Sequence, residues 1–189
     1  MSSGDLLGRV SRALDTAAVP YMVVGSFAST YHGRPRTTQD LDVVIDPTAA
    51  SLAAFLSQLD EASYYVSQEA ARDALERRGM FNVIDLATGW KVDLIVRKAR
   101  AFSEEEFRRR RPARILDLDV LVATAEDTVL AKLEWAALGE SERQLRDVQG
   151  VIDVRGDKLD VEYLERWALV LGVSESWQRL KPRRARRGS

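Results

Sequence analysis

Residues 41–46 (LDVVID) have the composition of a buried β-strand apart from their acidic residues, and two aspartates mark its start: Asp42 within the segment and Asp40 directly before it. Side chains alternate between the two faces of a strand, so both carboxylates point away from the hydrophobic residues between them. Two like charges on a buried face are costly unless a cation lies between them. Because they are about 7 Å apart along the strand, the two carboxylates can converge on one divalent cation or on a close pair of cations.

A third aspartate, Asp93, is in a similar position within residues 91–96 (KVDLIV). Alternation in this strand directs Val92 and Leu94 to one face and Asp93 to the other. If the two strands are neighbours, three carboxylates meet on one face of a sheet. Asp85 is a competing candidate, but it lies near an expected turn, where a solvent-exposed aspartate is ordinary.

Gly25 and Ser26 end a hydrophobic strand upstream of these aspartates. Glycine at a strand end lets the backbone approach a ligand closely, and the start of a following helix offers N–H groups and the Ser26 hydroxyl to a phosphate. If the strand extends upstream of Asp40, every second residue lies on the same face, so Arg36 and Thr38 share the face of the carboxylates. These residues together predict a site for phosphate and metal.

The composition narrows the chemistry further. The chain has 189 residues, no cysteine and a single histidine, His32. Disulfides, thiolate zinc sites and a cysteine nucleophile are excluded, and a catalytic triad or a histidine-rich metal site is disfavoured. Any metal must be held by oxygen ligands, which suit a hard cation such as Mg²⁺. The net charge of −1 gives no general attraction to polyanions, although basic residues cluster in 107–114 and 181–189.

The N-terminal segment and the hydropathy predict a cytoplasmic protein without a membrane partner. Residues 1–15 have the pattern of an amphipathic helix and lack the apolar core of a signal peptide. There is also no run of about 18 apolar residues, the length that a membrane-spanning helix needs.

Hydrophobic periodicity separates a strand-rich first part from a helical last part, with a change in period from two to about 3.6 after Thr124. Asp46 before Pro47 is typical of a helix N-cap and its first helical residue. The glutamates and arginines of residues 104–111 are typical of a solvent-exposed helix. Further strands are expected over 20–25 and 64–67, with a hairpin over 81–96, and further helices over 46–59, 69–78 and 159–171 and after capping boxes at Thr124 and Ser141.

These elements predict an α/β (α+β) fold in which a mixed sheet is followed by a C-terminal helical bundle. The expected domains are the sheet-containing core, residues 1–123, and a helical region that packs on it, residues 124–180. Residues 181–189 form a basic tail with the composition of a disordered segment.

The residues Val24-Gly25-Ser26, the pair Asp40-Leu41-Asp42 and the later Asp93 resemble the pattern of the nucleotidyltransferase superfamily. That superfamily includes DNA polymerase beta and the aminoglycoside nucleotidyltransferases. Its pattern is a hydrophobic residue, Gly, then Gly or Ser, a spacer, Asp-x-Asp, and a third carboxylate on a later strand. The resemblance extends over roughly residues 18–170.

Residues 126–152 resemble the helical half of a bacterial branch that contains abortive-infection and toxin–antitoxin nucleotidyltransferases. That branch carries a Lys on one helix and an Asp on the next, here Lys132 and Asp147. Two plainer interpretations stay open: Lys132 as a helix lysine that extends to solvent, and Asp147 as a surface charge paired with Arg143. The chain departs from the branch at Gly150, where another acidic residue is frequent.

The resemblance implies transfer of a nucleoside monophosphate from an NTP to a hydroxyl, with release of pyrophosphate. Asp40 and Asp42 would hold two Mg²⁺ ions, and Asp93 would bind the second ion and deprotonate the acceptor hydroxyl. In the same scheme Gly25 and Ser26 contact the outer phosphates. The residues implied for the charge of the triphosphate and for the helical motif are Lys132, Arg36 and Asp147.

The acceptor is not fixed by the sequence. Within the resembling branch it is a tRNA end, another RNA, a protein side chain or a small molecule, and a cognate antitoxin protein is a further partner implied there. The basic tail favours RNA, because clustered arginines attract phosphates regardless of sequence. Two rival functions are a catalytically idle nucleotide-binding or antitoxin-partner module and a metal-dependent phosphohydrolase.

Overall fold

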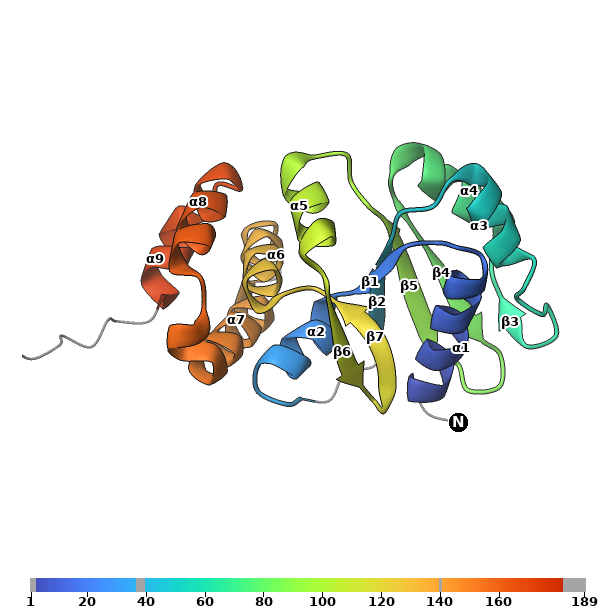
Figure 1. Ribbon diagram of the computed structural model, residues 1–189, viewed down its shortest axis with the longest axis horizontal. Helices are drawn as coiled ribbons and strands as arrows, with labels where there is room; N and C mark the ends of the chain where they lie inside the picture. The colour runs from blue at the N-terminus through green and yellow to red at the C-terminus, as the bar shows by residue number, and fades with distance from the viewer. Residues whose placement is uncertain (1–2, 37–39, 140, 182–189) are drawn as a thin grey trace, which may run out of the picture. The chain divides into compact units, whose positions relative to one another are not determined.

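Seven strands form one mixed sheet in the computed structural model, which describes residues 3–36, 40–139 and 141–181, without the side chains of Ser3, Asp40 and Ser141 (Figure 1). The strand order is β3-β4-β5-β2-β1-β7-β6. The pairs β2/β5 and β1/β7 are parallel and the other pairs are antiparallel. The strands are β1 (Tyr21–Val23), β2 (Asp40–Ile45), β3 (Tyr64–Tyr65), β4 (Met80–Asp85), β5 (Lys91–Val96), β6 (Arg111–Ile115) and β7 (Leu118–Val122).

The chain divides into two compact units, which we call the sheet unit (residues 1–28 and 37–124) and the helical unit (residues 29–36 and 125–189). Helix α2 (Gly25–His32) begins in the first and ends in the second. The expected α/β fold with a mixed sheet followed by helices is therefore confirmed.

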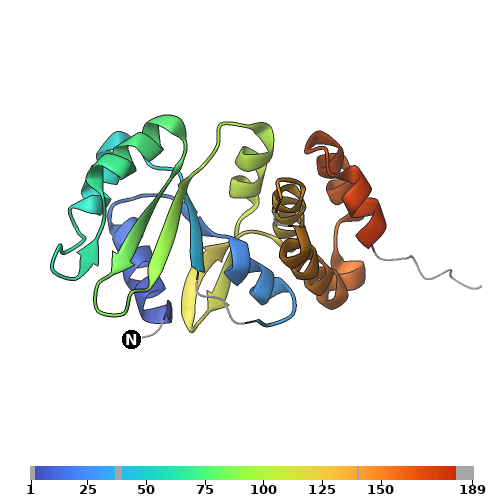
Figure 2. The same cartoon turned by 180° about the vertical axis from the view of Figure 1, so that it is seen from behind.

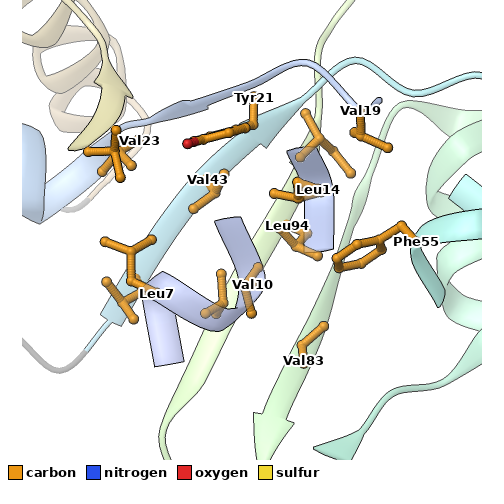
Figure 3. Packing of buried hydrophobic residues seen from close by; sticks show 14 of the residues in the cluster. Leu7, Val10, Leu14, Val19, Tyr21, Val23, Val43, Phe55, Val83 and Leu94 are labelled. Carbon is orange, nitrogen blue, oxygen red and sulfur yellow. The ribbon is translucent and has the colours of Figure 1, made fainter. Parts of the chain in front are cut away.

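One face of the sheet carries the main core of the sheet unit. The expected amphipathic helix is α1 (Ser3–Thr16), and Figure 3 shows its Leu7, Val10 and Leu14 packed over Val43 of β2 and Leu94 of β5. Helices α3 (Ala49–Leu56) and α4 (Gln68–Arg77) contribute to the same core. The opposite face has a smaller cluster, built from Met22, Ala123 and Phe107 of α5 (Ala101–Arg109).

In the helical unit, α6 packs against α7 and α8, and α8 packs against α9. The fully buried side chains Leu133, Leu164 and Trp177 come from three of these helices. Asp160 caps α8 by accepting a hydrogen bond from the backbone N–H of Tyr163. The helices are α6 (Ala125–Ala137), α7 (Ser141–Arg155), α8 (Val161–Val170) and α9 (Ser174–Leu180), with a short 3₁₀ turn at Gly156–Lys158.

Two sequence expectations about helices were wrong. Helix α3 is capped by Thr48 and not by Asp46, because Thr48 and Ser51 form a reciprocal capping box. Asp46 instead forms an ion pair with Arg97, with 3.0 Å between Oδ2 and Nε. Helix α5 is not solvent-exposed all round, because Phe107 and two of its polar residues are buried along with Phe102.

The hairpin of β6 and β7 was absent from the sequence expectations. Its two-residue turn consists of Leu116 and Asp117, with φ angles of +50° and +62°. Such turns usually carry Gly or Asn, which tolerate positive φ. The expected hairpin of β4 and β5 does form (Figure 2). Its register places Asn82 opposite Asp93.

Among the described residues, no helix is both long and apolar enough to span a membrane. The predicted basic tail lies outside the described residues except for Lys181, whose Nζ is 3.1 Å from Glu165 Oε1.

Candidate active site

Asp42 and Asp93 lie side by side on the parallel strands β2 and β5. The register pairs Asp42 with Asp93 directly, and neighbouring strands are about 4.8 Å apart. The adjacent Leu41, Val43 and Leu94 belong to the main core on the other face. Asp42 is half-buried and Asp93 is buried. The expectation that these strands are neighbours and that their carboxylates share a face is confirmed.

Asp40 opens β2, with its backbone opposite Lys91 in the register. Its side chain lies outside the described residues, so its part in the carboxylate group stays a prediction.

The carboxylate of Asp93 is held by two side chains that the sequence reasoning did not single out. Asn82 donates from Nδ2 to Oδ1 at 3.2 Å, and Lys91 donates from Nζ to Oδ2 at 3.0 Å. Asn82 is opposite Asp93 on β4, and Lys91 is two residues before it on β5. For Lys91 the sequence did contain a signal, because a polar residue two positions away in a strand lies on the same face.

Gly25 packs directly against Asp42. Its φ of +61° disfavours any other residue. A Cβ at this position would lie only 2.0 Å from Asp42 Oδ2. The neighbouring Val24 donates its N–H to the backbone oxygen of Asp42 at 3.0 Å. Gly25 is therefore required both by its backbone conformation and by the closeness of the carboxylate, and the buried Ser26 follows it at the start of α2.

The donor set of this region fits a hard divalent cation. Two carboxylates on adjacent strands supply oxygen ligands, and they repel each other without a cation. A side chain at position 25 would fill the space against Asp42. Among the described side chains, no group of three or more acidic or histidine residues is close enough to bind a metal. Asp40, whose side chain lies outside the described residues, stays the predicted third carboxylate ligand.

A second polar cluster lies in the helical unit around Asp147. Lys132 Nζ is 2.9 Å from Asp147 Oδ2, and Arg36 Nε is 2.8 Å from Oδ1. Ser29 donates a longer hydrogen bond of 3.4 Å. Burial by itself raises the pKa of Asp147, but the hydrogen bonds and positive charges of Arg36 and Lys132 outweigh it and lower the pKa below its ordinary value.

This geometry overturns three sequence interpretations. Lys132 is buried, with 6% of its surface exposed, and does not extend to solvent. Asp147 is buried against Lys132 and Arg36 and is not a surface charge paired with Arg143. Arg36 lies outside β2 and groups with the helical unit, so it does not continue the row of strand carboxylates.

Two glycines bring the end of α2 against α7. A Cβ on Gly33 would lie 2.7 Å from the backbone nitrogen of Val151, and a Cβ on Gly150 would lie 3.4 Å from that of Arg34. This backbone contact holds the segment of Ser29 opposite α7. At Gly150 the contact with Arg34 is at ordinary van der Waals distance, so the packing gives no reason for the departure from the branch there.

Asp85 and His32 have structural roles. Asp85 is buried, accepts hydrogen bonds from the backbone of Ala87 and Thr88, and forms an ion pair with Arg9. It is therefore a turn-stabilising residue and not the exposed aspartate expected there. His32 is buried, and its Nδ1 is 2.9 Å from Arg155 Nη2.

The described fold is shared with solved nucleotidyltransferases. The antibiotic-resistance factor ANT(2'')-Ia in complex with adenylyl-2''-tobramycin superposes with a TM-score of 0.59 and 12% identity, over 91% of this chain and 98% of that chain. A nucleotidyltransferase-like antigen from Paracoccidioides brasiliensis gives 0.56 and 13%, over 94% and 92%. Lincomycin-bound LnuA, a lincosamide antibiotic adenylyltransferase, gives 0.53 and 10%, over 82% and 98%.

The sequence itself matches no protein-family model and no curated protein. At these low identities the structural likeness establishes the fold: the chain has the nucleotidyltransferase fold, as the motif resemblance implied. The finer resemblance to the abortive-infection and toxin–antitoxin branch stays a prediction.

Proposed function

We propose that this protein is a Mg²⁺-dependent nucleotidyltransferase that moves a nucleoside monophosphate from an NTP to a hydroxyl acceptor and releases pyrophosphate. The observation that carries the proposal is the register of Asp42 with Asp93, with Gly25 packed against Asp42. A pair of adjacent carboxylates beside a glycine and a helix start has the chemical groups that this reaction needs. The shared fold supports the same class of enzyme.

Asp40, Asp42 and Asp93 are the residues that would hold the metal, with two ions in the full site. Bound Mg²⁺ supplies positive charge to the attacking and leaving oxygens of an in-line displacement. Without it, the adjacent Asp42 and Asp93 would repel a polyphosphate, so the carboxylates alone cannot form the substrate site.

Gly25 and Ser26 bind the outer phosphates in this proposal. The first turn of a helix has backbone N–H groups without partners inside the helix, and these attract anions. Gly25 lets the phosphate approach the backbone, because it has no Cβ. The Ser26 hydroxyl adds a side-chain donor.

Asp93 accepts the proton of the acceptor hydroxyl on a carboxylate oxygen. Its partner Asn82 restricts the rotation of the carboxylate, which keeps one oxygen directed for proton transfer. Asp93 also provides a ligand for the second ion, so it acts on the acceptor side of the reaction.

In the helical unit, Lys132 and Arg36 are the proposed phosphate-binding cations, with Asp147 as the residue that orients both. Two positive charges and one negative charge leave this cluster with a formal charge of +1. Such a cluster is already ordered, so it can bind an anion with little loss of side-chain entropy.

We propose RNA, such as a tRNA end, as the acceptor, on the basis of the basic residues in 181–189. A small-molecule acceptor is the second candidate, because ANT(2'')-Ia was solved with adenylyl-2''-tobramycin and LnuA with lincomycin. A toxin-like role with a cognate antitoxin protein belongs to the same proposal and rests on the motif resemblance alone.

The test is incubation of the protein with each α-labelled NTP, Mg²⁺ and either total RNA or a small-molecule extract. Label in one fraction, with release of pyrophosphate, is the expected result. Asp42→Ala should remove the label, whereas Asp119→Asn, at an exposed aspartate on β7 of the same sheet, should keep it. Release of phosphate would indicate a phosphohydrolase, and no NTP consumption would indicate an idle nucleotide-binding module.

A further inference from the structure

Lys91 stands out among the described residues near Asp93, because its cation contacts a carboxylate that the proposed function assigns to a metal ion. Its Nζ is 3.0 Å from Oδ2 and 3.4 Å from Oδ1 of Asp93. The ammonium thus lies against both oxygens of this carboxylate.

The two partners of Asp93 differ in how firmly they are held. Asn82 is on β4 and directly opposite Asp93 in the register, so a short side chain suffices for its hydrogen bond. Lys91 is on the same strand as Asp93 and reaches it along the sheet face with a long side chain, of which 42% of the surface is exposed. Lys91 can therefore move into solvent without any change of the backbone, whereas Asn82 stays.

The surrounding charges explain why a cation is needed in the metal-free protein. Asp42 lies next to Asp93 in the register, and the backbone of Asp40 lies opposite Lys91 itself. A buried carboxylate beside another carboxylate is destabilised unless a positive charge compensates it. An ammonium and a divalent cation that contact the same carboxylate repel each other, so each weakens the binding of the other.

We infer that Lys91 is a positioning residue that is paired with the Asp93 carboxylate in the metal-free protein and dissociates from it when a divalent cation binds. The inference rests on the proposed function, because it takes Asp93 to be a metal ligand. Lys91 would thus compete with the metal, lowering its affinity while keeping the empty carboxylates compatible with the fold. Asn82 would keep the carboxylate oriented in both states.

The test compares Lys91→Met with the wild type in two measurements that need no turnover. Direct Mn²⁺ titration by electron paramagnetic resonance should give a dissociation constant that is lower by about two- to fivefold, the range expected for a partly exposed ion pair. Thermal unfolding in a chelator should give a lower midpoint than that of the wild type. Saturating Mg²⁺ should remove the difference, because a ligand that binds only the folded state stabilises it.

Two controls separate this role from a general effect of charge or packing. Lys98→Met removes the same charge from an exposed residue two positions past the end of β5 and seven residues after Lys91. It should leave both the Mn²⁺ affinity and the midpoints as in the wild type. Lys91→Arg keeps a cation at the end of a long side chain, and it should restore the midpoint in chelator.

Three outcomes would overturn the inference. Weaker or unchanged Mn²⁺ binding by Lys91→Met, beside normal binding by the wild type, would contradict it while leaving the proposed function intact. A midpoint lowered equally with and without Mg²⁺ would make Lys91 a purely structural residue. A wild-type protein that binds no divalent cation at all would remove the metal site, and with it both this inference and the proposed function.

Discussion

Asp93 and Asp147 are both buried carboxylates with a lysine ammonium nearby, at 3.0 Å and 2.9 Å, yet their surroundings have opposite charge balance. Asp93 has a second carboxylate, Asp42, beside it in the register. Asp147 has a second cation, Arg36, on its other oxygen. The first group, with Asp42, Asp93 and Lys91, therefore has a net negative charge, whereas in the second group the negative charge of Asp147 is more than balanced by Lys132 and Arg36.

This difference indicates what each cluster is for. Repulsion within a group of like charges lowers the stability of the metal-free protein, and binding of a cation restores that stability, which is the behaviour of a ligand site. A compensated buried cluster keeps its cations in fixed positions without any ligand, and removing one of its partners destabilises the fold. Substitutions in the two clusters should accordingly separate activity from stability.

The largest effect is expected from Asp42→Ala. Transfer should fall by at least about 10²- to 10³-fold, as when a group that stabilises the transition state is lost, and it should be undetectable in a standard assay. Stability without metal should be unchanged or slightly higher, because the repulsion with Asp93 is relieved. Single-turnover transfer and thermal unfolding are the two measurements. Wild-type turnover, or a variant that fails to fold, would contradict the assignment of Asp42 as a metal ligand.

Asp93→Asn should separate chemistry from binding, because asparagine keeps the shape but cannot accept the proton. Transfer should fall by about 10²-fold or more, as for loss of a general base. The affinity for Mg²⁺·NTP should stay within about tenfold of the wild type, since Asp40, Asp42 and Ser26 remain. Nucleotide titration beside single-turnover transfer checks this. Equal losses of affinity and rate would make Asp93 mainly a ligand for the metal of the nucleotide.

Asp147→Asn should act on stability even without substrate. It leaves Lys132 and Arg36 without a counter-charge in a buried place, which should cost about 3 kcal/mol of unfolding free energy. The matched control is Asp153→Asn on the same helix, where an exposed pair with Arg34 should cost less than about 1 kcal/mol. Urea unfolding measures both. Equal costs in the two variants would mean that the buried cluster is no more important than a surface pair.

The smallest effect is on the pH dependence of stability. The pKa of Asp147 is lower in the folded protein than its ordinary value of 3.8, so its contribution is complete above that value and is lost as the pH falls through the lowered pKa. The wild type should therefore lose more stability than Asp147→Asn when the pH is lowered from about 5 to about 2. Urea midpoints at several pH values test this, and parallel curves for the two proteins would refute it.

Strand parity made the Asp42–Asp93 face predictable, because alternation is a local rule that needs only a few residues. The same rule failed for Arg36, which lies outside β2 and forms an ion pair with Asp147. The partners of Asp147 were out of reach for another reason. Arg36 is 111 residues away in the sequence, and no local pattern encodes such a pairing.

The hairpin of β6 and β7 was missed because its turn, Leu116-Asp117, has no glycine or asparagine to signal positive φ. Gly25 shows the opposite case. Its place before Ser26 at the strand end suggested close approach of a ligand, and the structure adds that Asp42 already occupies the space of a side chain there. Glycine in the sequence indicated that space was needed, but not which neighbour needed it.

The most direct test of the contrast between the clusters is thermal unfolding of the wild type, Asp42→Ala and Asp147→Asn, each in a chelator and in saturating Mg²⁺ with NTP. We predict that Asp42→Ala unfolds at or above the wild-type midpoint in the chelator, and that Mg²⁺ and NTP raise its midpoint only slightly. We predict that Asp147→Asn unfolds well below the wild-type midpoint in the chelator, and that Mg²⁺ still raises its midpoint. The result that would contradict this contrast is an Asp42→Ala variant with a lower midpoint than the wild type in the chelator, together with a rise in midpoint on adding Mg²⁺ and NTP that is as large as that of the wild type.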